Sequence, residues 1–291
     1  MNEINIFCFG FGQVAKNFIK KLNSENISVK LSTTSREKTQ KNFFENINYE
    51  NFEFNENTFD PKLEENLKKS DYILISIAPI NGNDIVIKNC QSIIQNSSAK
   101  WITYLSATSV YGDHKGKLVD EKSDTNPTSS SGISRLNAEK SWMNLAESKD
   151  LPIQIFRLSG IYSNERNMLV RLKKGEAKII NKKNHFFSRI HVEDIANILF
   201  KSLEKFLSKE IYNISDDKPA TAEEVIIYGS KLLGIDIPER IEVDSIQGEM
   251  LKNFYNDSKK VSNKKAKSFF NYEFKYPTYV EGLNYIKNNF I

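Results

Sequence analysis

A glycine-rich turn near the start of the chain constrains the fold most. Residues 4–9 form an apolar run that predicts a short buried strand, and residues 13–22 carry apolar side chains at helical spacing. Between them, Gly10-Phe11-Gly12-Gln13-Val14-Ala15 matches G-x-G-x-x-G/A, with alanine at the third position. In a strand–turn–helix setting this pattern predicts a loop that brings a helix N-terminus to the diphosphate of a dinucleotide. The alternative interpretation is an ordinary glycine-rich turn.

Strand-like and helix-like segments continue to alternate after this turn, which indicates a parallel sheet covered by helices on both faces. Strands are predicted at 29–33, 52–54, 72–77, 101–105, 153–158 and 211–214, and helices around Lys41 and at 61–69, 85–94, 134–146 and 192–206. The tail has helical patterns around 222–233, 259–270 and 279–287 but no regular alternation. We therefore expect an α/β fold: a Rossmann-type doubly wound parallel sheet with a smaller, mostly helical C-terminal cap. The coenzyme-binding domain would comprise residues 1–162 and 189–214, and the substrate cap residues 163–188 and 215–291.

Composition excludes several classes of protein. The chain has 41 Lys and Arg against 37 Asp and Glu, and this small, dispersed excess predicts neither a nucleic-acid partner nor an anionic membrane surface. Two cysteines and three histidines exclude a disulfide framework and a conventional zinc cluster, so no metal is expected. The apolar runs are shorter than the ~20 residues of a membrane span. The sequence runs into its first strand without a basic leader, and we expect a cytoplasmic protein.

The end of the second predicted strand bears on the choice of coenzyme. NAD sites usually place an acidic residue there, to bind the ribose 2′-hydroxyl. Here the segment reads Thr33-Thr34-Ser35-Arg36-Glu37-Lys38, and no carboxylate stands where the strand ends. Arg36 can fork onto a 2′-phosphate, with Ser35 and Lys38 assisting, so NADP is favoured over NAD. The alternative is that Arg36 is a solvated loop charge, although cations are disfavoured at the start of a helix.

Several blocks, in the same order along the chain, resemble the extended short-chain dehydrogenase/reductase superfamily, in particular its NAD-dependent epimerase/dehydratase-like branch. They are the phosphate loop at 10–15, YILISIAP at 72–79, LSATSVYGD at 105–113, the helix start at 132–139, RLSGIY at 157–162 and RIHVEDIA at 189–196. The resemblance implies that the ends of these strands pass the coenzyme and that the helix at 134–149 pairs with its symmetry mate in a homodimer.

The sequence departs from this superfamily at its catalytic positions. The resemblance places Ser131 where the family has a tyrosine, Arg135 where it has a lysine, and Ala107 where it has a serine or threonine. No tyrosine occurs between Gly112 and Ile161, so a shift of register does not supply one. Serine is a much weaker acid than tyrosine, and arginine stays protonated and cannot relay a proton. Arg135 could still hold the nicotinamide ribose, or it could form a surface salt bridge with Glu139.

The candidate site residues follow from these alignments. The catalytic candidates are Tyr111, Ser131 and Arg135; the coenzyme candidates are Gly10, Phe11, Gly12, Gln13, Val14, Ser35, Arg36, Ala78, Pro79, Ser106, Arg135 and Ile161; the substrate candidates are Thr108, Tyr162 and Arg189. Some of these residues have structural alternatives: Tyr111 could only pack, and Tyr162 could be a pocket wall rather than an acid. Glu193 and Asp194 are not site candidates, because they are more simply explained as acids that suit a helix start. Ser129, Ser130 and Ser131 are expected to form a flexible polar rim, and His114 to lie in an exposed loop.

The resemblance implies an NAD(P)-dependent oxidoreductase or epimerase that acts on a small polar, sugar-derived substrate, here with an altered catalytic set. The alternative is a non-catalytic, NADP-binding regulatory or scaffold protein, since a fold can keep its coenzyme site after the chemistry is lost.

Overall fold

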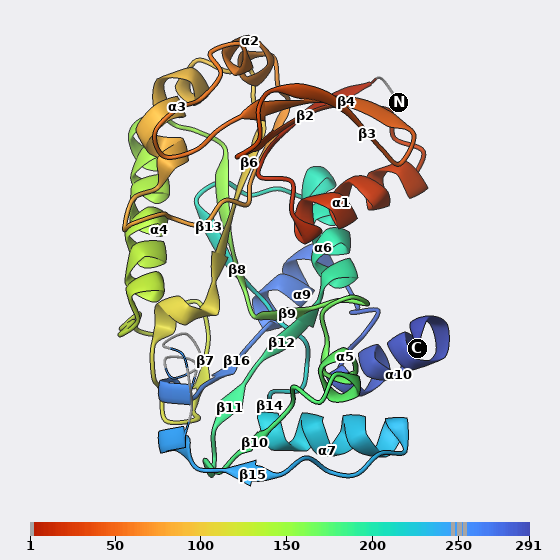
Figure 1. Cartoon of the computed structure of the whole chain (residues 1–291). Helices are drawn as coiled ribbons and strands as arrows, with labels where there is room; N and C mark the ends of the chain where they lie inside the picture. Colours follow the sequence, from red (N-terminus) through yellow and green to blue (C-terminus); the bar gives the residue numbers. More distant parts are fainter. Residues whose placement is uncertain (1–2, 246–247, 249–251, 253–254) are drawn as a thin grey trace. The chain divides into compact units, whose positions relative to one another are not determined.

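The chain divides into two compact units, each assembled from three separate stretches of sequence. The computed structural model describes residues 3–245, 248, 252 and 255–291. The first unit comprises residues 1–107, 133–157 and 195–211, and the second comprises residues 108–132, 158–194 and 212–291. Figure 1 labels most of the helices and strands of both units.

An eight-stranded sheet organises the first unit, in the order β13-β8-β6-β5-β1-β2-β4-β3. Its strands are β1 (Ile4–Phe9), β2 (Val29–Ser35), β3 (Gln40–Phe44), β4 (Ile47–Glu53), β5 (Tyr72–Ile75), β6 (Trp101–Ala107), β8 (Ile153–Leu158) and β13 (Glu210–Ile214). β1 pairs in parallel with β2 on one side and with β5 on the other. The strand order therefore reverses at β1, and ligands of such sheets bind at that point, beyond the carboxyl ends of the strands. The predicted α/β class with a Rossmann-type, mostly parallel sheet is confirmed.

Helices pack against the sheet through buried apolar side chains. The helices are α1 (Gln13–Ser24), α2 (Leu63–Lys68), α3 (Ile85–Gln95), α4 (Ser130–Ser148) and α6 (Val192–Glu204). Asp84 begins α3 by accepting hydrogen bonds from the backbone N–H groups of Val86 and Ile87, and its second carboxylate oxygen accepts 2.8 Å from Trp142 Nε1. This contact links α3 to α4 over a core that includes Phe7, Phe9 and Trp142.

One predicted helix is absent, and a strand stands in its place. The segment around Lys41 forms β3, which pairs antiparallel with β4 and turns at Glu45 and Asn46, both with positive φ. Figure 1 shows this hairpin beside β2 in the N-terminal part of the chain. Glutamate is an unusual residue for a left-handed turn position, so the sequence lacks the Asn-Gly or Asp-Gly signal that predicts such hairpins.

The second unit is built from short strands and helices around its own core. Its elements are η1 (Thr108–Tyr111), β7 (Leu118–Val119), β9 (Gly160–Tyr162), α5 (Met168–Lys173), β10 (Ile179–Ile180), β11 (Phe186–Phe187), β12 (Arg189–His191), β14 (Ala220–Thr221), α7 (Ala222–Leu233), β15 (Arg240–Ile241), η2 (Val243–Ser245), β16 (Lys260–Val261), α9 (Lys264–Phe270) and α10 (Tyr279–Phe290). The helix predicted at 259–270 is shorter, because Lys260 and Val261 pair with β7 instead. Tyr162, Leu169, Val225 and Leu283 contribute to the core between α5, α7 and α10.

Candidate functional site

The glycine-rich loop follows β1 directly, and its first glycine is required by the fold. Gly10 has φ +83°, a conformation that side chains with a Cβ rarely adopt, and a Cβ there would lie 2.9 Å from Ser76 Oγ. The Gly10 N–H donates to Thr34 Oγ1 at 3.0 Å, and Ser76 Oγ donates to the carbonyl oxygens of Phe9 and Gly10. Side chains from β2 and from the segment after β5 therefore fix the turn.

The second glycine is not required by the fold. Gly12 precedes α1 with φ −83° and ψ −170°, an extended conformation that any residue adopts, and no side chain caps this helix. A Cβ at Gly12 would meet no heavy atom within 4 Å. Neither backbone strain nor packing calls for glycine here, and the open space beside a helix N-terminus fits the approach of a diphosphate.

The other loop residues of the candidate coenzyme site lie on and around α1. Gln13 and the buried Val14 begin the helix, and Phe11 is half-buried. The Phe11 ring packs 5.3 Å from the ring of Phe44 and 5.1 Å from that of Tyr49, measured between centroids. The β3–β4 hairpin, which the sequence did not predict, therefore covers the middle of the phosphate loop.

The turn after β2 carries the residues predicted to select the coenzyme. Ser35 ends β2, and Arg36 and Lys38 follow it with exposed side chains. Asn51 of β4 donates to Ser35 Oγ at 2.8 Å, and the Glu37 N–H donates to the same oxygen at 3.1 Å. Because the turn leads into β3, the prediction that Arg36 stands at a helix start is wrong.

The remaining coenzyme candidates lie at the ends of other strands. Ala78 is exposed and Pro79 half-buried in the segment after β5, whereas Ile161 is half-buried on β9 of the second unit, in register with Ile190. Ser106, near the end of β6, is buried, and its Oγ has no hydrogen-bond partner among the residues that the structure describes. A buried hydroxyl without a partner is costly, and in the first unit it fits a site that a polar ligand completes.

The start of α4 holds the residues at the family's catalytic positions. Ser130 and Ser131 are helical rather than part of a loose rim, and Ser129 Oγ accepts from the Gly132 N–H at 3.1 Å, as helix-capping residues do. Ser131 is exposed, and its Oγ lies 3.4 Å from Ser129 Oγ. Ala107, which has no side-chain hydroxyl, ends β6.

Arg135 and Glu139 do not pair as the surface salt bridge would require. Arg135 Nη1 donates to the carbonyl oxygen of Leu105 at 3.1 Å, at the end of β6. Glu139 is buried and binds Arg157 of β8 with an Nη2–Oε2 distance of 2.7 Å and further bonds from Nε. The side chain of Arg135 is therefore held at the carboxyl edge of the sheet, where the resemblance predicts the nicotinamide ribose.

Tyr111 of the second unit lies in η1, together with the half-buried Thr108. Tyr111 is fully buried, and its hydroxyl donates to Asn213 Oδ1 at 2.7 Å. These contacts match the packing alternative and leave the hydroxyl directed into protein. His114 is half-buried rather than exposed, and its Nε2 lies 3.1 Å from the carbonyl oxygens of Tyr111 and Asp124.

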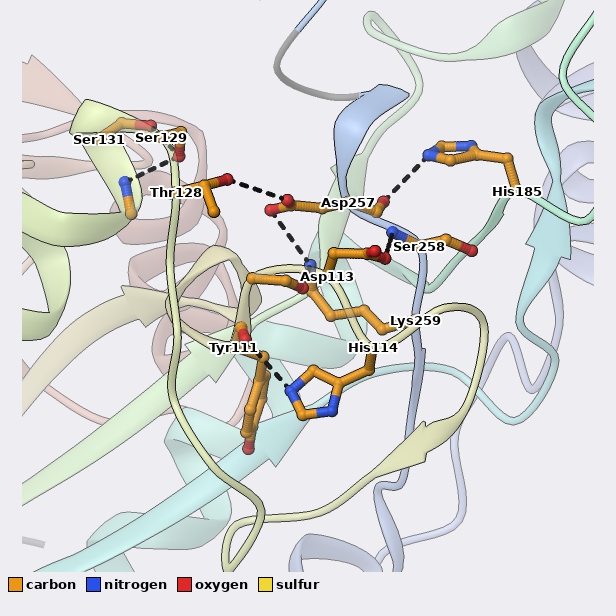
Figure 2. A network of polar contacts seen from close by, with 12 residues as sticks. Tyr111, Asp113, His114, Thr128, Ser129, Ser131, His185, Asp257, Ser258 and Lys259 are labelled. Carbon is orange, nitrogen blue, oxygen red and sulfur yellow. Dashed lines mark hydrogen bonds and ion pairs between the residues drawn. The ribbon is translucent and has the colours of Figure 1, made fainter.

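A polar network that no sequence pattern indicates secures the loop around Gly112 (Figure 2). Lys259 Nζ donates to the carbonyl oxygen of Gly112 at 2.8 Å and lies 3.6 Å from Asp257 Oδ2. Asp113 Oδ1 accepts from the Ser258 N–H, and Asp257 Oδ1 accepts from Thr128 Oγ1 at 3.4 Å. Burial lowers the pKa of Lys259. Apart from Asp257 and Lys259, the paired residues are more than a hundred positions apart in the sequence, so no local pattern could have shown the network.

The substrate candidates Tyr162 and Arg189 are both buried. The Tyr162 hydroxyl has no hydrogen-bond partner in the described part of the chain, and its ring lies in the core of the second unit. Arg189 donates from Nη1 to the carbonyl oxygens of Ala220 and Phe187, and its guanidinium carbon lies 3.4 Å from the centroid of the Phe187 ring. Burial lowers the pKa of Arg189 to about 10, so the group stays charged at neutral pH.

The RIHVEDIA block supplies structural contacts. Glu193 and Asp194 stand in the first turn of α6. Asp194 is fully buried and accepts from the Tyr272 hydroxyl at 2.6 Å and from the N–H groups of Lys275 and Tyr276. Burial lowers the pKa of His191 to about 4, so this imidazole is neutral at physiological pH.

Two kinds of feature are missing from the described residues. They contain no group of three or more histidine, cysteine, aspartate or glutamate side chains arranged to bind a metal ion. None of the helices that the structure describes is both long enough and apolar enough to cross a bilayer.

Solved structures and a known family resemble this chain. A functionally unknown conserved protein from Silicibacter pomeroyi DSS is 31% identical, with 98% of each chain covered and a TM-score of 0.85. dTDP-glucose 4,6-dehydratase from Bacillus anthracis, solved in complex with NAD, is 19% identical over 98% of this chain and 96% of that one, with a TM-score of 0.76. UDP-glucose 4-epimerase from Thermotoga maritima, solved with UDP-glucose, is 18% identical over 99% and 98%, with a TM-score of 0.74.

No curated protein matches the chain in sequence at a significant level. The dTDP-glucose 4,6-dehydratase and the UDP-glucose 4-epimerase share the fold of this chain. Residues 10–215 match the NAD dependent epimerase/dehydratase family, and this segment includes the phosphate loop, the end of β6 and the RIHVEDIA block. The chain therefore belongs to the NAD dependent epimerase/dehydratase family.

Proposed function

We propose that this protein is an NADP-dependent oxidoreductase or epimerase that acts on a small polar, sugar-derived substrate. The observation that carries the proposal is Gly12: its Cβ position is open and its backbone is unstrained, so a ligand, not the fold, accounts for the glycine. The sugar-derived substrate is suggested by similar folds, among them MoeE5, which was solved in complex with UDP-glucose and with UDP-glucuronic acid.

The candidate residues keep their proposed roles in each unit. In the first unit the diphosphate would be held by the loop at 10–15, the 2′-phosphate by Ser35 and Arg36, and the rest of the coenzyme near Ala78, Pro79, Ser106 and Arg135. In the second unit Ile161 remains the coenzyme candidate, and Thr108, Tyr162 and Arg189 remain the substrate candidates. The division into a coenzyme domain and a substrate cap, with the predicted boundaries, belongs to the same proposal.

The charge of the turn after β2 favours NADP over NAD. Arg36 is exposed at the turn after β2, and the carboxylate typical of NAD sites does not stand at the end of this strand. Several similar folds were solved with NAD, so coenzyme titration is the decisive test. We expect NADPH to bind more tightly than NADH, and Arg36→Ala to narrow the difference. Lys41→Ala, which removes another exposed cation from the adjoining strand, is the matched control and should leave the ratio unchanged. If the wild type bound NADPH and NADH equally tightly, the assignment of NADP as the coenzyme would be wrong.

The proposed chemistry must work without the family's tyrosine–lysine pair. A bound nicotinamide supplies the hydride donor or acceptor. Arg135 stays protonated and can hold a ribose hydroxyl while anchored on Leu105, but it cannot pass a proton. Ser131 is exposed at the start of α4 and can orient a substrate hydroxyl, but it is too weak an acid to act alone. Tyr111 is the remaining candidate for the proton donor.

The contacts of Tyr111 favour a second candidate function, a non-catalytic NADP-binding protein. Its hydroxyl is buried and already donates to Asn213, so a proton could leave it only if that contact broke. Turnover of NADPH or NADP with a panel of carbonyl compounds and nucleotide sugars separates the two functions. An enzyme should show coenzyme oxidation or reduction, or epimer formation, that Gly12→Val abolishes. Tight NADPH binding with no turnover across the panel would favour the regulatory protein.

A further inference from the structure

A short chain of hydrogen bonds joins the interior of the sheet to the turn that carries Arg36. Thr33 of β2 and Asn51 of β4 are paired in register, and both are buried, Asn51 with 4% of its surface exposed. Thr33 Oγ1 donates to Asn51 Oδ1 at 3.0 Å, and Asn51 Nδ2 donates to Ser35 Oγ at 2.8 Å. The Asn51 amide therefore spans two side chains of the neighbouring strand.

Ser35 uses its oxygen to shape the turn. The Glu37 N–H donates to Ser35 Oγ at 3.1 Å, a local contact that bends the backbone around Arg36. The chain is also held at this point by the Phe54 N–H, which donates to the Ser35 carbonyl oxygen at 2.7 Å. The direction in which Arg36 leaves the sheet thus depends on where Ser35 Oγ stands.

The two N–H groups that donate to Ser35 Oγ determine which hydrogen bond its hydroxyl can still form with a ligand. A hydroxyl has two acceptor lone pairs and one hydrogen to donate. Asn51 and Glu37 occupy both lone pairs, and no acceptor for the hydrogen occurs among the residues that the structure describes. The group can therefore only donate, which suits a phosphate oxygen.

We propose that Asn51 is a positioning residue for coenzyme selection: it directs the Ser35 hydroxyl hydrogen away from the sheet, toward the 2′-phosphate of NADP, and steadies the turn at Arg36. The inference rests on the proposed function, because it assumes that this turn meets the adenosine ribose. Asn51 does not touch the coenzyme in this proposal and acts through Ser35.

Asn51→Asp is the sharpest test, because aspartate has nearly the same shape but only acceptor oxygens. Ser35 must then turn its hydrogen inward to the new carboxylate and present its oxygen to the phosphate. We expect NADPH to bind roughly tenfold more weakly, the order of one hydrogen bond to a charged acceptor, and NADH to change by less than about threefold. Isothermal titration of both coenzymes against wild type and variant measures the ratio, and circular dichroism verifies folding.

A double-mutant cycle separates this route from the effect of an added charge. In a protein that already carries Ser35→Ala, adding Asn51→Asp should not weaken NADPH binding any further. If the aspartate instead repelled the phosphate directly, the affinity for NADPH would still fall in this background. Asn66→Asp is the matched control: Asn66 of α2 donates 3.1 Å to Ser32 Oγ, three residues earlier on the same strand, and this change should leave the NADPH-to-NADH ratio unaltered.

The wild-type ratio tests the proposed function, and the variants test the role of Asn51. A wild type that prefers NADPH through Arg36, together with an Asn51→Asp variant of unchanged affinity, would mean that Ser35 already donates inward and would overturn this inference alone. An equal loss of NADPH affinity in the Ser35→Ala background would also overturn it. A wild type without preference for NADPH would remove the NADP assignment and this inference with it.

Discussion

Replacing Gly12 by serine should separate the requirements of the fold from those of the ligand. The residue precedes α1 in an extended conformation, its Cβ position is empty, and α1 has no side-chain cap. A serine there can accept from the first free N–H groups of the helix, which is worth a few tenths of a kcal/mol over glycine. Loss of unfolded-state freedom adds about 0.4–1 kcal/mol, as for glycine-to-alanine changes at unstrained positions.

The variant should therefore be more stable than the wild type by about 0.7–1.3 kcal/mol, which corresponds to a rise of roughly 1–5 °C in melting temperature. It should also lose at least about tenfold in NADPH affinity, because the added side chain fills the space of the diphosphate and separates it from the helix N–H groups, each worth ~1.5–3 kcal/mol. Scanning calorimetry and coenzyme titration measure the two effects on the same sample.

Gly10→Ser is the contrasting control. Its positive φ and the 2.9 Å approach to Ser76 predict a loss of about 1–3 kcal/mol of stability from strain alone. The ligand-based explanation of Gly12 would be refuted by a serine variant that binds NADPH as well as the wild type, or by one that melts several degrees lower.

Four further predictions concern packing, charge, pH and assembly. Gly282→Ala should cost about 1–3 kcal/mol, because its Cβ would stand 2.0 Å from the Tyr162 hydroxyl, and Tyr162→Phe should restore part of the loss in a double variant; chemical denaturation that shows no recovery contradicts this packing. Glu139→Ala should destabilise by ~3–5 kcal/mol, since it strands the buried Arg157, and a loss below ~1 kcal/mol in urea unfolding contradicts this. Burial raises the pKa of the Asp216 carboxyl in the folded state from 3.8 to about 8, so its contribution to stability is complete below the unfolded pKa and is lost as pH rises through 8. The melting temperature of the wild type should therefore fall from pH 5 to pH 9, and that of Asp216→Asn should fall less steeply. Parallel melting curves for the two proteins would exclude the effect. The helix at 134–149 is expected to form a homodimer interface, and a monomer in light scattering at micromolar concentration rejects that expectation.

The sequence sufficed where local patterns fixed the structure. Continuous apolar strands such as 72–75 and the turn at 10–15 led directly to the mostly parallel sheet and to the family. The sequence-based predictions are wrong where the pairing of one strand with another decides the secondary structure. The QKNFF segment at 40–44 has a half-exposed, polar pattern that suits a surface helix as well as an edge strand, and only its register with β4 makes it β3.

The candidate site shows the same division. The loop glycines and Arg36 could be singled out from spacing alone, although their roles stay predictions. The bond from Asn51 to Ser35 depends on the pairing of β2 with β4, and the contacts of Lys259 with Gly112 join positions 147 residues apart. Glu139 pairs with Arg157 and not with Arg135, the partner suggested by helical spacing, because of where α4 packs against β8. Such contacts arise from tertiary packing, which helical or strand periodicity does not encode.

The attachment of the 108–132 segment to residues 257–259 has a consequence for biosynthesis. The ribosome releases Tyr111 and Ser131 long before it reaches Lys259, whose ammonium group closes the Gly112 turn. The segment therefore cannot acquire its final form before Lys259 has been synthesised, so a nascent or prematurely terminated chain that ends before this residue would lack the finished loop.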